Sequence, residues 1–433
     1  MAPTRSQLEA STKALELVLA FDRPADAVLH DFLRAHRALG SRDRAFIGDT
    51  VYGVLRRKRT LEHVVSGRGP RSMVLAWLAR YGSTSVRDLA PVLSADEAKW
   101  LAGLKAAALD GLPLAVRLEL PDWVVEKLST QLSDSDLVAT ARGLNDAAPL
   151  DLRVNTLLAE REEVLRELVA DGIPAVPTPY SPVGVRVRGR PAINRHPLFT
   201  RGAIEVQDES SQLLGYLVAP RRHEVIVDFC AGAGGKTLHL GALMHSHGRV
   251  YALDVSASRL ARLRPRLSRS RLSNVHPQVI RNENDSRVKR LAGKIDRALV
   301  DAPCSGLGTL RRNPDLKWRQ TPQSVAELVV KQTSILGSAA RLVKPGGRLI
   351  YATCSILREE NEDIVSRFLA EHGDFHELHC GDLLSRQGIP LDTGCYLTLR
   401  PHLHQTDGFF AAVLERGSGE ANGVGDEKAP QHT

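Results

Sequence analysis

The first third of the chain repeats apolar residues at helical spacing. This pattern predicts helices within residues 8–20, 27–35, 46–65, 74–79 and 100–108, and no stretch alternates as a half-buried strand would. Residues 1–142 are therefore expected to form an all-helical domain. A basic cluster lies in the third predicted helix, where it is either a solvated helix end or a contact for RNA phosphates: Arg56, Arg57, Lys58 and Arg59.

Between residues 145 and 205 the pattern changes to short mixed elements. A strand is expected at 152–156, a helix at 160–170 and further strands up to residue 187, separated by prolines and glycine. We interpret this region as a small α+β module. Its arginines either face a phosphate backbone or are scattered surface charge: Arg153, Arg186, Arg188, Arg190 and Arg195.

From residue 206 apolar strands alternate with amphipathic helices. Strands are predicted at 225–229, 250–253, around 279, 298–300 and 349–352, and helices begin near Lys236, Ala257, Val325 and Glu362. This alternation predicts an α/β domain with a doubly wound parallel sheet over residues 206–416, with a last strand at 408–414 closing one edge. Residues 417–433 have little apolar content and are expected to be a disordered tail.

Composition limits the possible classes of protein. No run of about 18 apolar residues exists, and charges interrupt the apolar part of the amino terminus, so neither a membrane span nor a signal peptide is supported and a cytoplasmic protein is expected. Five cysteines without CxxC or zinc spacing argue against a disulfide framework and against a metal site. The excess of 58 lysines and arginines over 50 acidic residues suits a polyanionic partner.

A glycine-rich turn follows the first strand of the α/β domain, in the sequence DFCAGAGGKT at 228–237. Glycines allow a ligand to approach the backbone, and the amides at a helix start favour an electron-rich group. Asp254, about 20 residues further on, lies where an acid accepts hydrogen bonds from ribose hydroxyls. Asp285, after the next strand, is a candidate for an adenine amino group. Because neither GxGxxG nor Walker spacing is present, these residues favour a nucleoside cofactor without a pyrophosphate, such as S-adenosylmethionine.

Two later strands each deliver a cysteine to their carboxyl ends. RALVDAPC ends with Asp301 and Cys304, and RLIYATC ends with Cys354. If these strands are neighbours, roughly 4.8 Å apart, both thiols open onto one pocket.

Paired thiols suit methylation of carbon 5 of a pyrimidine. A thiolate that adds to carbon 6 makes carbon 5 nucleophilic, and a second group helps to release the product. Asp301 is placed to hold the ring nitrogen and amino edge of cytosine. The residues alone leave open which thiol attacks, and Lys317 and Arg311 are candidates for the positive group that promotes thiolate formation.

These motifs resemble those of the RNA cytosine-5 methyltransferases, and all but the tail is similar to the Sun/Fmu branch, which modifies 16S ribosomal RNA. The resemblance is carried by DFCAGAGGKT, ALDVS, DAPCSGLGTLRRNPDLKW, YATCSILREENEDIV and VQDESSQL, with LRVNT in the small module and LGSRDRAFIGDTVYGVLRRKRTL in the helical domain. It implies a Rossmann-like class I methyltransferase domain, an RNA-binding small module and a NusB-like RNA-binding first domain.

The same resemblance implies roles for individual residues. Cys354 would be the nucleophile and Cys304 would assist product release. The residues that would contact S-adenosylmethionine or the target base are Cys230, Ala231, Gly232, Ala233, Gly234, Gly235, Lys236, Asp254, Asp285 and Asp301.

Several alternatives stay open. The RNA partner is ribosomal RNA or, alternatively, transfer RNA, and the chain is expected to be a monomer. A non-catalytic RNA-binding or ribosome-assembly protein and a nicotinamide-dependent oxidoreductase are competing functions. A further basic strip, interrupted by Pro265, either contacts phosphates or is an exposed helix face: Arg259, Arg262, Arg264, Arg266, Arg269 and Arg271.

Overall fold

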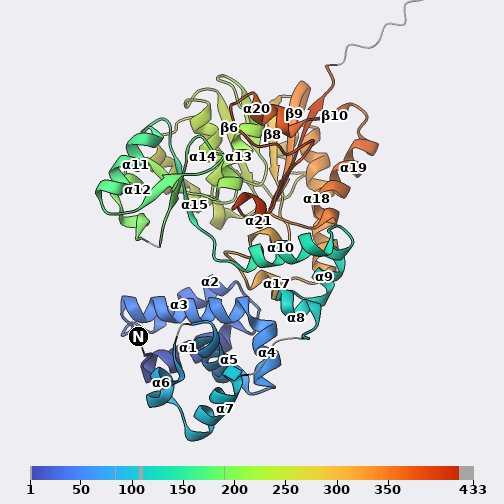
Figure 1. Cartoon of the computed structure of the whole chain (residues 1–433). Coiled ribbons are helices and arrows are strands. Elements are labelled where there is room, and N and C mark those ends of the chain that lie inside the picture. Colours follow the sequence, from blue (N-terminus) through green and yellow to red (C-terminus); the bar gives the residue numbers. More distant parts are fainter. Residues whose placement is uncertain (1, 83, 107–110, 190, 419–433) are drawn as a thin grey trace, which may run out of the picture.

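The computed structural model describes residues 2–82, 84–106, 111–189 and 191–418 and has three parts (Figure 1). A helical domain precedes a small α+β module and an α/β domain, which confirms the predicted fold class. Of the predicted disordered tail, residues 419–433 lie outside the described residues. Within the described ranges, no helix combines the length and the apolar character that a membrane crossing requires.

The amino-terminal domain consists of helices around one apolar core, which includes Leu15, Val51 and Leu75. Its elements are α1 (Arg5–Val18), α2 (Ala25–Ala35), α3 (Ser41–Arg56), α4 (Lys58–Val65), α5 (Gly69–Arg80), α6 (Val86–Leu89) and α7 (Ala95–Ala106). The single helix predicted at 46–65 is two helices, because the backbone leaves helical geometry at Arg57 (φ −110°, ψ 20°). Its likeness to NusB stays a prediction.

Three further helices belong to a different core. They are α8 (Leu114–Leu118), α9 (Asp122–Ser129) and α10 (Asp134–Asn145). Their apolar side chains pack with Leu307, Leu310 and Leu357 of the α/β domain. The change of core therefore falls between α7 and α8, not at residue 142, because helical periodicity does not reveal which core a helix covers.

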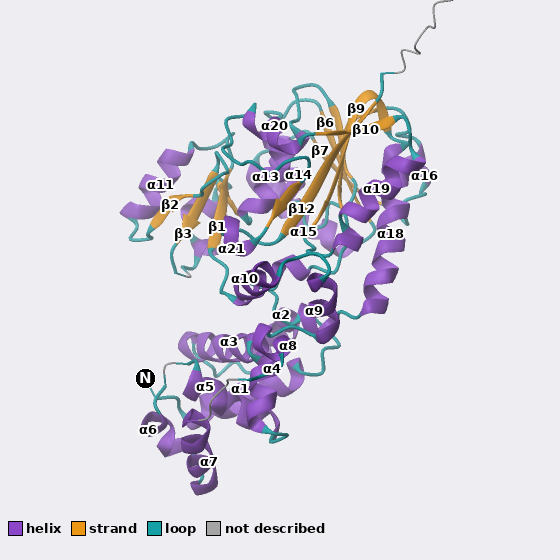
Figure 2. Cartoon of the chain, turned by 45° about the vertical axis from the view of Figure 1, so that its right-hand side comes forward, coloured by secondary structure: helices purple, strands orange, loops and turns teal. Residues whose placement is uncertain are grey.

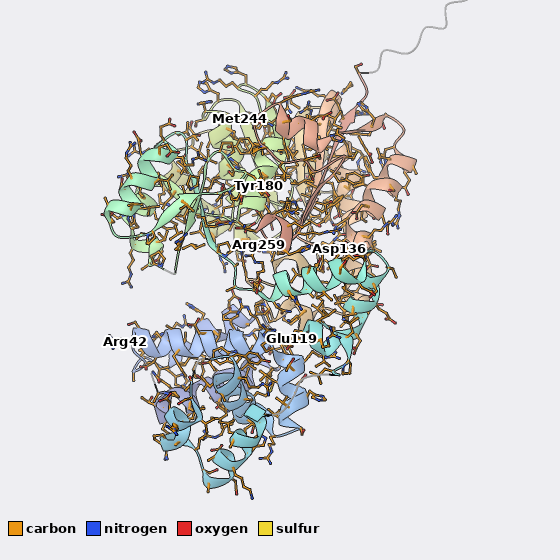
Figure 3. The ribbon with its side chains drawn as sticks, in the orientation of Figure 1. Arg42, Glu119, Asp136, Tyr180, Met244 and Arg259 are labelled. Atoms are coloured by element: carbon orange, nitrogen blue, oxygen red, sulfur yellow. The ribbon has the colours of Figure 1, made fainter. Side chains whose placement is uncertain are left out.

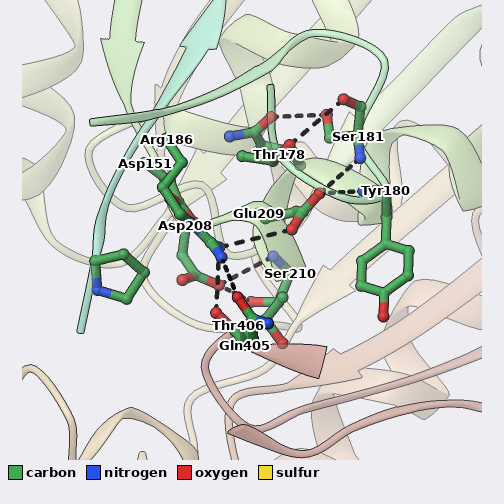
Figure 4. A network of polar contacts seen from close by, with 12 residues as sticks. Asp151, Thr178, Tyr180, Ser181, Arg186, Asp208, Glu209, Ser210, Gln405 and Thr406 are labelled. Carbon is green, nitrogen blue, oxygen red and sulfur yellow. Dashed lines mark hydrogen bonds and ion pairs between the residues drawn. The ribbon is translucent and has the colours of Figure 1, made fainter. Parts of the chain in front are cut away.

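The small module has a four-stranded antiparallel sheet in the order β2-β3-β1-β4. Its elements are β1 (Leu150–Val154), α11 (Arg161–Ala170), β2 (Ala175–Pro177), β3 (Gly184–Val187), α12 (Pro197–Thr200) and β4 (Ile204–Val206). Figure 4 shows the polar network that joins the module to the α/β domain. Arg186 pairs with Asp151 at 2.8 Å and donates to the carbonyl of Gln405, and Glu209 accepts hydrogen bonds from two backbone N–H groups of the module.

The arginines of the small module differ in burial and in their partners. Arg153 is buried, and Arg186 is committed to Asp151, so neither is available for phosphate. Arg188 and Arg195 are exposed. Arg190 lies outside the described residues.

The α/β domain is built on a mixed sheet in the order β10-β12-β9-β8-β5-β6-β7, with β11 paired to β12. Five strands are parallel: β5 (Val225–Asp228), β6 (Arg249–Asp254), β7 (Val275–Val279), β8 (Ile295–Asp301) and β9 (Val343–Thr353). The antiparallel strands are β10 (Phe375–Leu378), β11 (Leu397–Leu399) and β12 (Phe409–Arg416). The strand predicted at 408–414 is therefore not an edge, since β10 pairs with its outer side.

Helices cover both faces of this sheet, as a doubly wound fold requires (Figure 2). One face packs against α13 (Glu209–Val218), α14 (Gly235–Leu243), α15 (Ala257–Ser270) and α20 (Cys380–Ser385). The other packs against α18 (Pro322–Ala340) and α19 (Glu362–Glu371). Short helices α16 (Ser286–Lys289), α17 (Leu316–Arg319) and α21 (Pro401–His404) lie in the connections.

The helical domain docks on α17. Asp315 accepts a hydrogen bond from the backbone N–H of Ala25 at 3.1 Å, and the indole N–H of Trp318 donates to the carbonyl of Leu55 at 3.1 Å. Lys317 is fully buried between them and donates to Asn145 Oδ1 at 2.7 Å. Burial lowers the pKa of Lys317 to about 7. Lys317 therefore serves a domain contact.

Candidate active site

The carboxyl ends of the central parallel strands open onto one cavity of about 670 Å³, a usual size for a small-molecule site. Among the predicted site residues, the cavity brings together Cys230, Ala231, Gly232, Ala233, Asp254, Asp301, Cys304 and Cys354. Gly234, Gly235, Lys236 and Asp285 are not part of its lining. Side chains from α15 and α18 complete the wall: Arg259 belongs to the basic strip noted in the sequence, whereas no sequence motif indicated Lys331 and Ile335.

The two predicted thiols meet because β8 and β9 are neighbouring parallel strands. Asp301 pairs in register with Ala352, so both strands end at the same level. Cys304 Sγ and Cys354 Sγ lie 3.4 Å apart, within hydrogen-bonding distance. The expectation that both thiols open onto one pocket is met.

The two thiols have unequal environments. The hydrogen bond with Cys354 and burial both raise the pKa of Cys304 well above its usual range. A raised pKa disfavours the thiolate form, so Cys304 is held as a thiol.

A lysine lies beside the reactive groups. Lys236 forms an ion pair of 2.7 Å with Asp301, and its ammonium lies 5.5 Å from the ring centre of Phe409. Burial alone would lower the pKa of Lys236, but the charge and hydrogen bond of Asp301 outweigh it, and the pKa is raised. The negative charge of a Cys354 thiolate acts in the same direction. Lys236 therefore keeps a positive charge beside Asp301 that interacts with Cys354.

The two cations suggested from the sequence as promoters of thiolate formation, Lys317 and Arg311, do not lie at the thiols. Lys317 lies in the contact with the helical domain, and Arg311 donates to the carbonyl of Thr406 at 2.8 Å. Neither lines the cavity. Both follow Cys304 closely in sequence, but the chain turns away from the thiols after Leu307, whose side chain packs under α8–α10.

The glycine turn is held in place by carboxylate and guanidinium groups. Gly232 N–H donates to Asp254 Oδ2 at 2.8 Å, and Asp254 Oδ1 accepts from Ser256 N–H at 2.7 Å. Arg153 donates to the carbonyl of Gly235 at 2.6 Å. Gly234 has φ +83°, and a Cβ there would lie 2.1 Å from Leu263 Cδ1, so this glycine is needed for packing.

Asp285 does not reach the cavity. Its carboxylate caps α16 by accepting a hydrogen bond from Arg287 N–H and also accepts one from Arg281 N–H in the preceding loop, both at 2.9 Å, and these bonds lower its pKa. Glu283, two residues earlier, lines the cavity together with Ile280 and accepts a hydrogen bond from Ser334 at 2.6 Å. The acid after β7 that faces the cavity is therefore Glu283. The conformation of the loop, which the sequence does not specify, decides between the two.

The lining fits a nucleoside methyl donor. Asp254 and Glu283 supply acceptors from the β6 and β7 ends, the turn at 230–233 supplies backbone groups, and the thiols lie at the β8 and β9 ends. Such a donor would be held by Asp254, Glu283 and the glycine turn.

The basic strip of α15 is divided between two uses. Arg266 and Arg269 both pair with Glu205, and Arg266 also donates to the carbonyl of Ala233. Arg259, Arg262, Arg264 and Arg271 are exposed. Figure 3 places Arg259 at the border of the α/β domain that is turned toward α3.

The cluster at residues 56–59 is likewise mostly engaged within the protein. Arg56 donates to the carbonyl of Arg311 at 2.7 Å, Lys58 pairs with Glu62, and Arg59 pairs with Asp122. These arginine contacts hold α3 and α4 against the rest of the chain. The sequence suggested that this cluster is either a solvated helix end or a phosphate contact. It did not indicate the domain contact that the structure shows.

Two family models match the chain. One describes the 16S rRNA methyltransferase RsmB/F and matches residues 215–415. The other describes an RsmF/B-like ferredoxin-like domain and matches residues 120–194. The second match includes α9 and α10, so it also separates these helices from the amino-terminal helical domain.

Known proteins are similar over nearly the whole length. The probable ribosomal RNA small subunit methyltransferase B of Synechocystis is 33% identical, with 91% of this chain and 96% of that protein covered. The protein of that name from Bacillus subtilis is 30% identical, with 87% and 92% covered.

Solved structures share the fold. The crystal structure of PH0851 has a TM-score of 0.79 at 27% identity and covers 96% of this chain and 100% of that one. NSun6 from Pyrococcus horikoshii with SFG has a TM-score of 0.61 at 20% identity, with 68% and 98% covered.

If Glu283 faces the cavity and Asp285 does not, substitutions of these two acids should differ in their effect on cofactor affinity. Glu283→Gln should weaken binding of S-adenosylhomocysteine about fivefold or more, because a charged acceptor in the cavity is lost, a change of about 1 kcal/mol. Asp285→Asn should leave affinity within about twofold, because asparagine is an equally good helix cap. Isothermal titration calorimetry measures both, and a larger loss for Asp285→Asn would contradict the assignment.

Proposed function

This chain belongs to the RsmB/F family of 16S rRNA methyltransferases, and we propose that it transfers a methyl group from S-adenosylmethionine to carbon 5 of a cytosine in 16S ribosomal RNA. Carbon 5 is proposed as the methylated atom because two thiols lie 3.4 Å apart at one end of a nucleoside-sized cavity. Methylation of an exocyclic nitrogen or a ribose oxygen needs no thiol, because those atoms are nucleophiles already.

We assign the attack to Cys354. The positive charge of Lys236 interacts with Cys354, whereas the raised pKa of Cys304 disfavours the thiolate form of that residue. Addition of Cys354 Sγ to carbon 6 moves electron density to carbon 5, and S-adenosylmethionine, when bound, supplies an electrophilic methyl group. We assign Asp301, held by Lys236, to accept a hydrogen bond from the amino group of the cytosine, and one from its ring nitrogen once that nitrogen carries a proton.

Product release requires loss of the proton on carbon 5 and cleavage of the bond between carbon 6 and sulfur. Cys304 lies within hydrogen-bonding distance of the departing Cys354 sulfur and gives it a proton as the bond between carbon 6 and sulfur breaks. The Cys304 thiolate formed in this way takes the proton from carbon 5, and the electrons of that bond restore the double bond between carbons 5 and 6. We therefore assign product release to Cys304.

Ribosomal RNA is the partner that the relatives support, and we propose that the chain acts on it as a monomer in the cytoplasm. The cysteines are all unpaired among the described residues, which suits a reducing compartment. The exposed arginines on α15 begin at the cavity wall with Arg259, which supports a path for an RNA backbone toward the cavity.

Transfer of labelled methyl from S-adenosylmethionine tests the function. Incubation with 16S rRNA, with transfer RNA and with the assembling small subunit, followed by digestion to nucleosides, should place label in 5-methylcytidine of the ribosomal substrates. Label in another nucleoside would overturn the reaction, and label confined to transfer RNA would overturn the substrate.

The roles of the two thiols predict opposite behaviour of single variants. Cys304→Ala should accumulate a covalent protein–RNA adduct, because release is blocked after attack. Cys354→Ala should form no adduct and should lose turnover by at least about a hundredfold, as expected when a nucleophile is removed. Denaturing gel electrophoresis with labelled RNA detects the adduct, and adducts with the roles reversed would exchange the assignments.

The exposed arginines of α15 predict a change in the salt dependence of RNA binding. Replacing Arg259, Arg262, Arg264 and Arg271 by glutamine should reduce the slope of log affinity against log salt by about 0.7–0.9 for each lost phosphate contact. Fluorescence anisotropy over a series of salt concentrations measures the slope. The matched control replaces four exposed arginines that do not line the cavity, Arg222, Arg290, Arg367 and Arg386, and an equal change in the control would contradict a specific role for α15.

A further inference from the structure

Glu360 is a fully buried carboxylate with no basic partner among the described residues, and four hydrogen-bond donors converge on it. Its Oε1 accepts from Ser305 N–H at 2.8 Å and from Gln332 Nε2 at 2.9 Å. Its Oε2 accepts from the hydroxyls of Ser305 and Ser355. A buried carboxylate is tolerated only when its lone pairs are used in this way.

These donors belong to the two loops that bear the thiols. Ser305 follows Cys304 directly, Ser355 follows Cys354 directly, and the two serine hydroxyls lie 3.2 Å apart. Gln332 also donates to the carbonyl of Pro303 at 3.0 Å, on the other side of Cys304. One carboxylate therefore connects the backbone next to both sulfurs.

The turn that carries Glu360 is itself anchored to β9. Tyr351 Oη donates to the carbonyl of Glu360 at 2.6 Å, Thr353 Oγ1 donates to Asn361 Oδ1 at 2.5 Å, and the side-chain amide of Asn361 donates to the carbonyl of Ser355 at 3.2 Å. Glu360 is thus fixed relative to the strand that delivers Cys354.

The sheet alone does not fix the sulfurs. Regular pairing of β8 with β9 ends at Asp301, followed by one bond from Ala302 N–H to the carbonyl of Ala352 at 2.8 Å. Both cysteines lie beyond this point, where a bond from Gly308 N–H to the carbonyl of Cys354 is the next backbone link. A side chain that bridges the loops is therefore needed to define the distance between the thiols.

We propose that Glu360 is a positioning residue that holds the loops of Cys304 and Cys354 in the arrangement that lets the two sulfurs act as a pair. This inference rests on the proposed function, in which both thiols take part in one reaction. Glu360 is not among the residues that line the cavity, and it acts through the two serines.

The negative charge of Glu360 also acts on the pKa of Cys304. The hydrogen bond with Cys354 and burial are the larger causes of the raised pKa of Cys304, and the negative charge of Glu360 adds to them. Other titratable groups that surround the thiols are Cys230, Lys236, Asp254, Glu283, Asp301, Lys331 and Tyr351. Removal of the charge at residue 360 should therefore ease ionisation of Cys304.

Three variants separate geometry from charge. Glu360→Gln removes the charge, Glu360→Asp keeps it but shortens the reach, and Glu359→Gln is the matched control, because the neighbouring Glu359 pairs with Lys127 at 2.6 Å. Both Glu360 variants should lower kcat for methyl transfer by at least about tenfold while KM for RNA and the affinity for S-adenosylhomocysteine stay within about twofold. Glu359→Gln should leave all three quantities unchanged.

Alkylation of Cys304 supplies a readout that a merely structural role would not move. In a Cys354→Ala background, the rate of modification of the Cys304 peptide by iodoacetamide, followed by mass spectrometry against pH, should show a midpoint about one unit lower with Glu360→Gln. Glu360→Asp should leave the midpoint within about 0.3 units of the parent. This measurement needs no RNA, so it tests Glu360 even if the proposed reaction fails, whereas absence of methylation by the parent chain counts against the reaction alone.

Two outcomes would overturn the proposal: kcat within about threefold of the parent for both Glu360 variants, or an unmoved Cys304 midpoint in Glu360→Gln. If the Glu360 variants do not fold, Ser305→Ala and Ser355→Ala remove one donor each and leave the carboxylate in place. Each should then lower kcat by at least about fivefold with the thermal unfolding midpoint within a few degrees of the parent, and unchanged kcat in both would reject the proposal.

Discussion

Parallel pairing of β8 with β9 is the constraint on which the site depends. The register of Asp301 with Ala352 brings the ends of both strands to one level, and Cys304 and Cys354 follow within three residues. A slip of one residue would turn each side chain to the opposite face of its strand and separate the thiols from the cavity. Residues of both strands are buried against helices on the two faces of the sheet, which packs the pair into the core.

Each acidic side chain at the cavity has a partner that stabilises its position. Asp301 is neutralised by Lys236, while Asp254 is held by backbone N–H groups of the glycine turn and of α15. Beneath the turn, burial raises the pKa of Asp228 to about 7, and Thr237 donates to its carboxylate at 2.6 Å. Each acid at the strand ends therefore has its own set of hydrogen-bond or ion-pair partners.

The motif around Cys304 serves two purposes that look continuous in the sequence. Its first part carries the thiol and Ser305, which binds Glu360. Its last part, Asp315 to Trp318, holds the helical domain through α2 and α3. One segment of chain therefore links the reactive sulfur to the domain contact, and this is why residues that were candidates for thiol activation are committed elsewhere.

The sequence by itself determined the alternation of strands and helices, the glycine turn and the two strands that end in cysteine, because periodicity and turn chemistry are local properties. It did not determine that Glu283 rather than Asp285 faces the cavity, that Arg266 and Arg269 bind Glu205, or that β10 covers β12. Each of these depends on which distant segment lies opposite a long side chain or a strand edge. Only the tertiary structure brings such segments together, and it is also what placed the charge of Glu360 between two cysteines that are fifty residues apart.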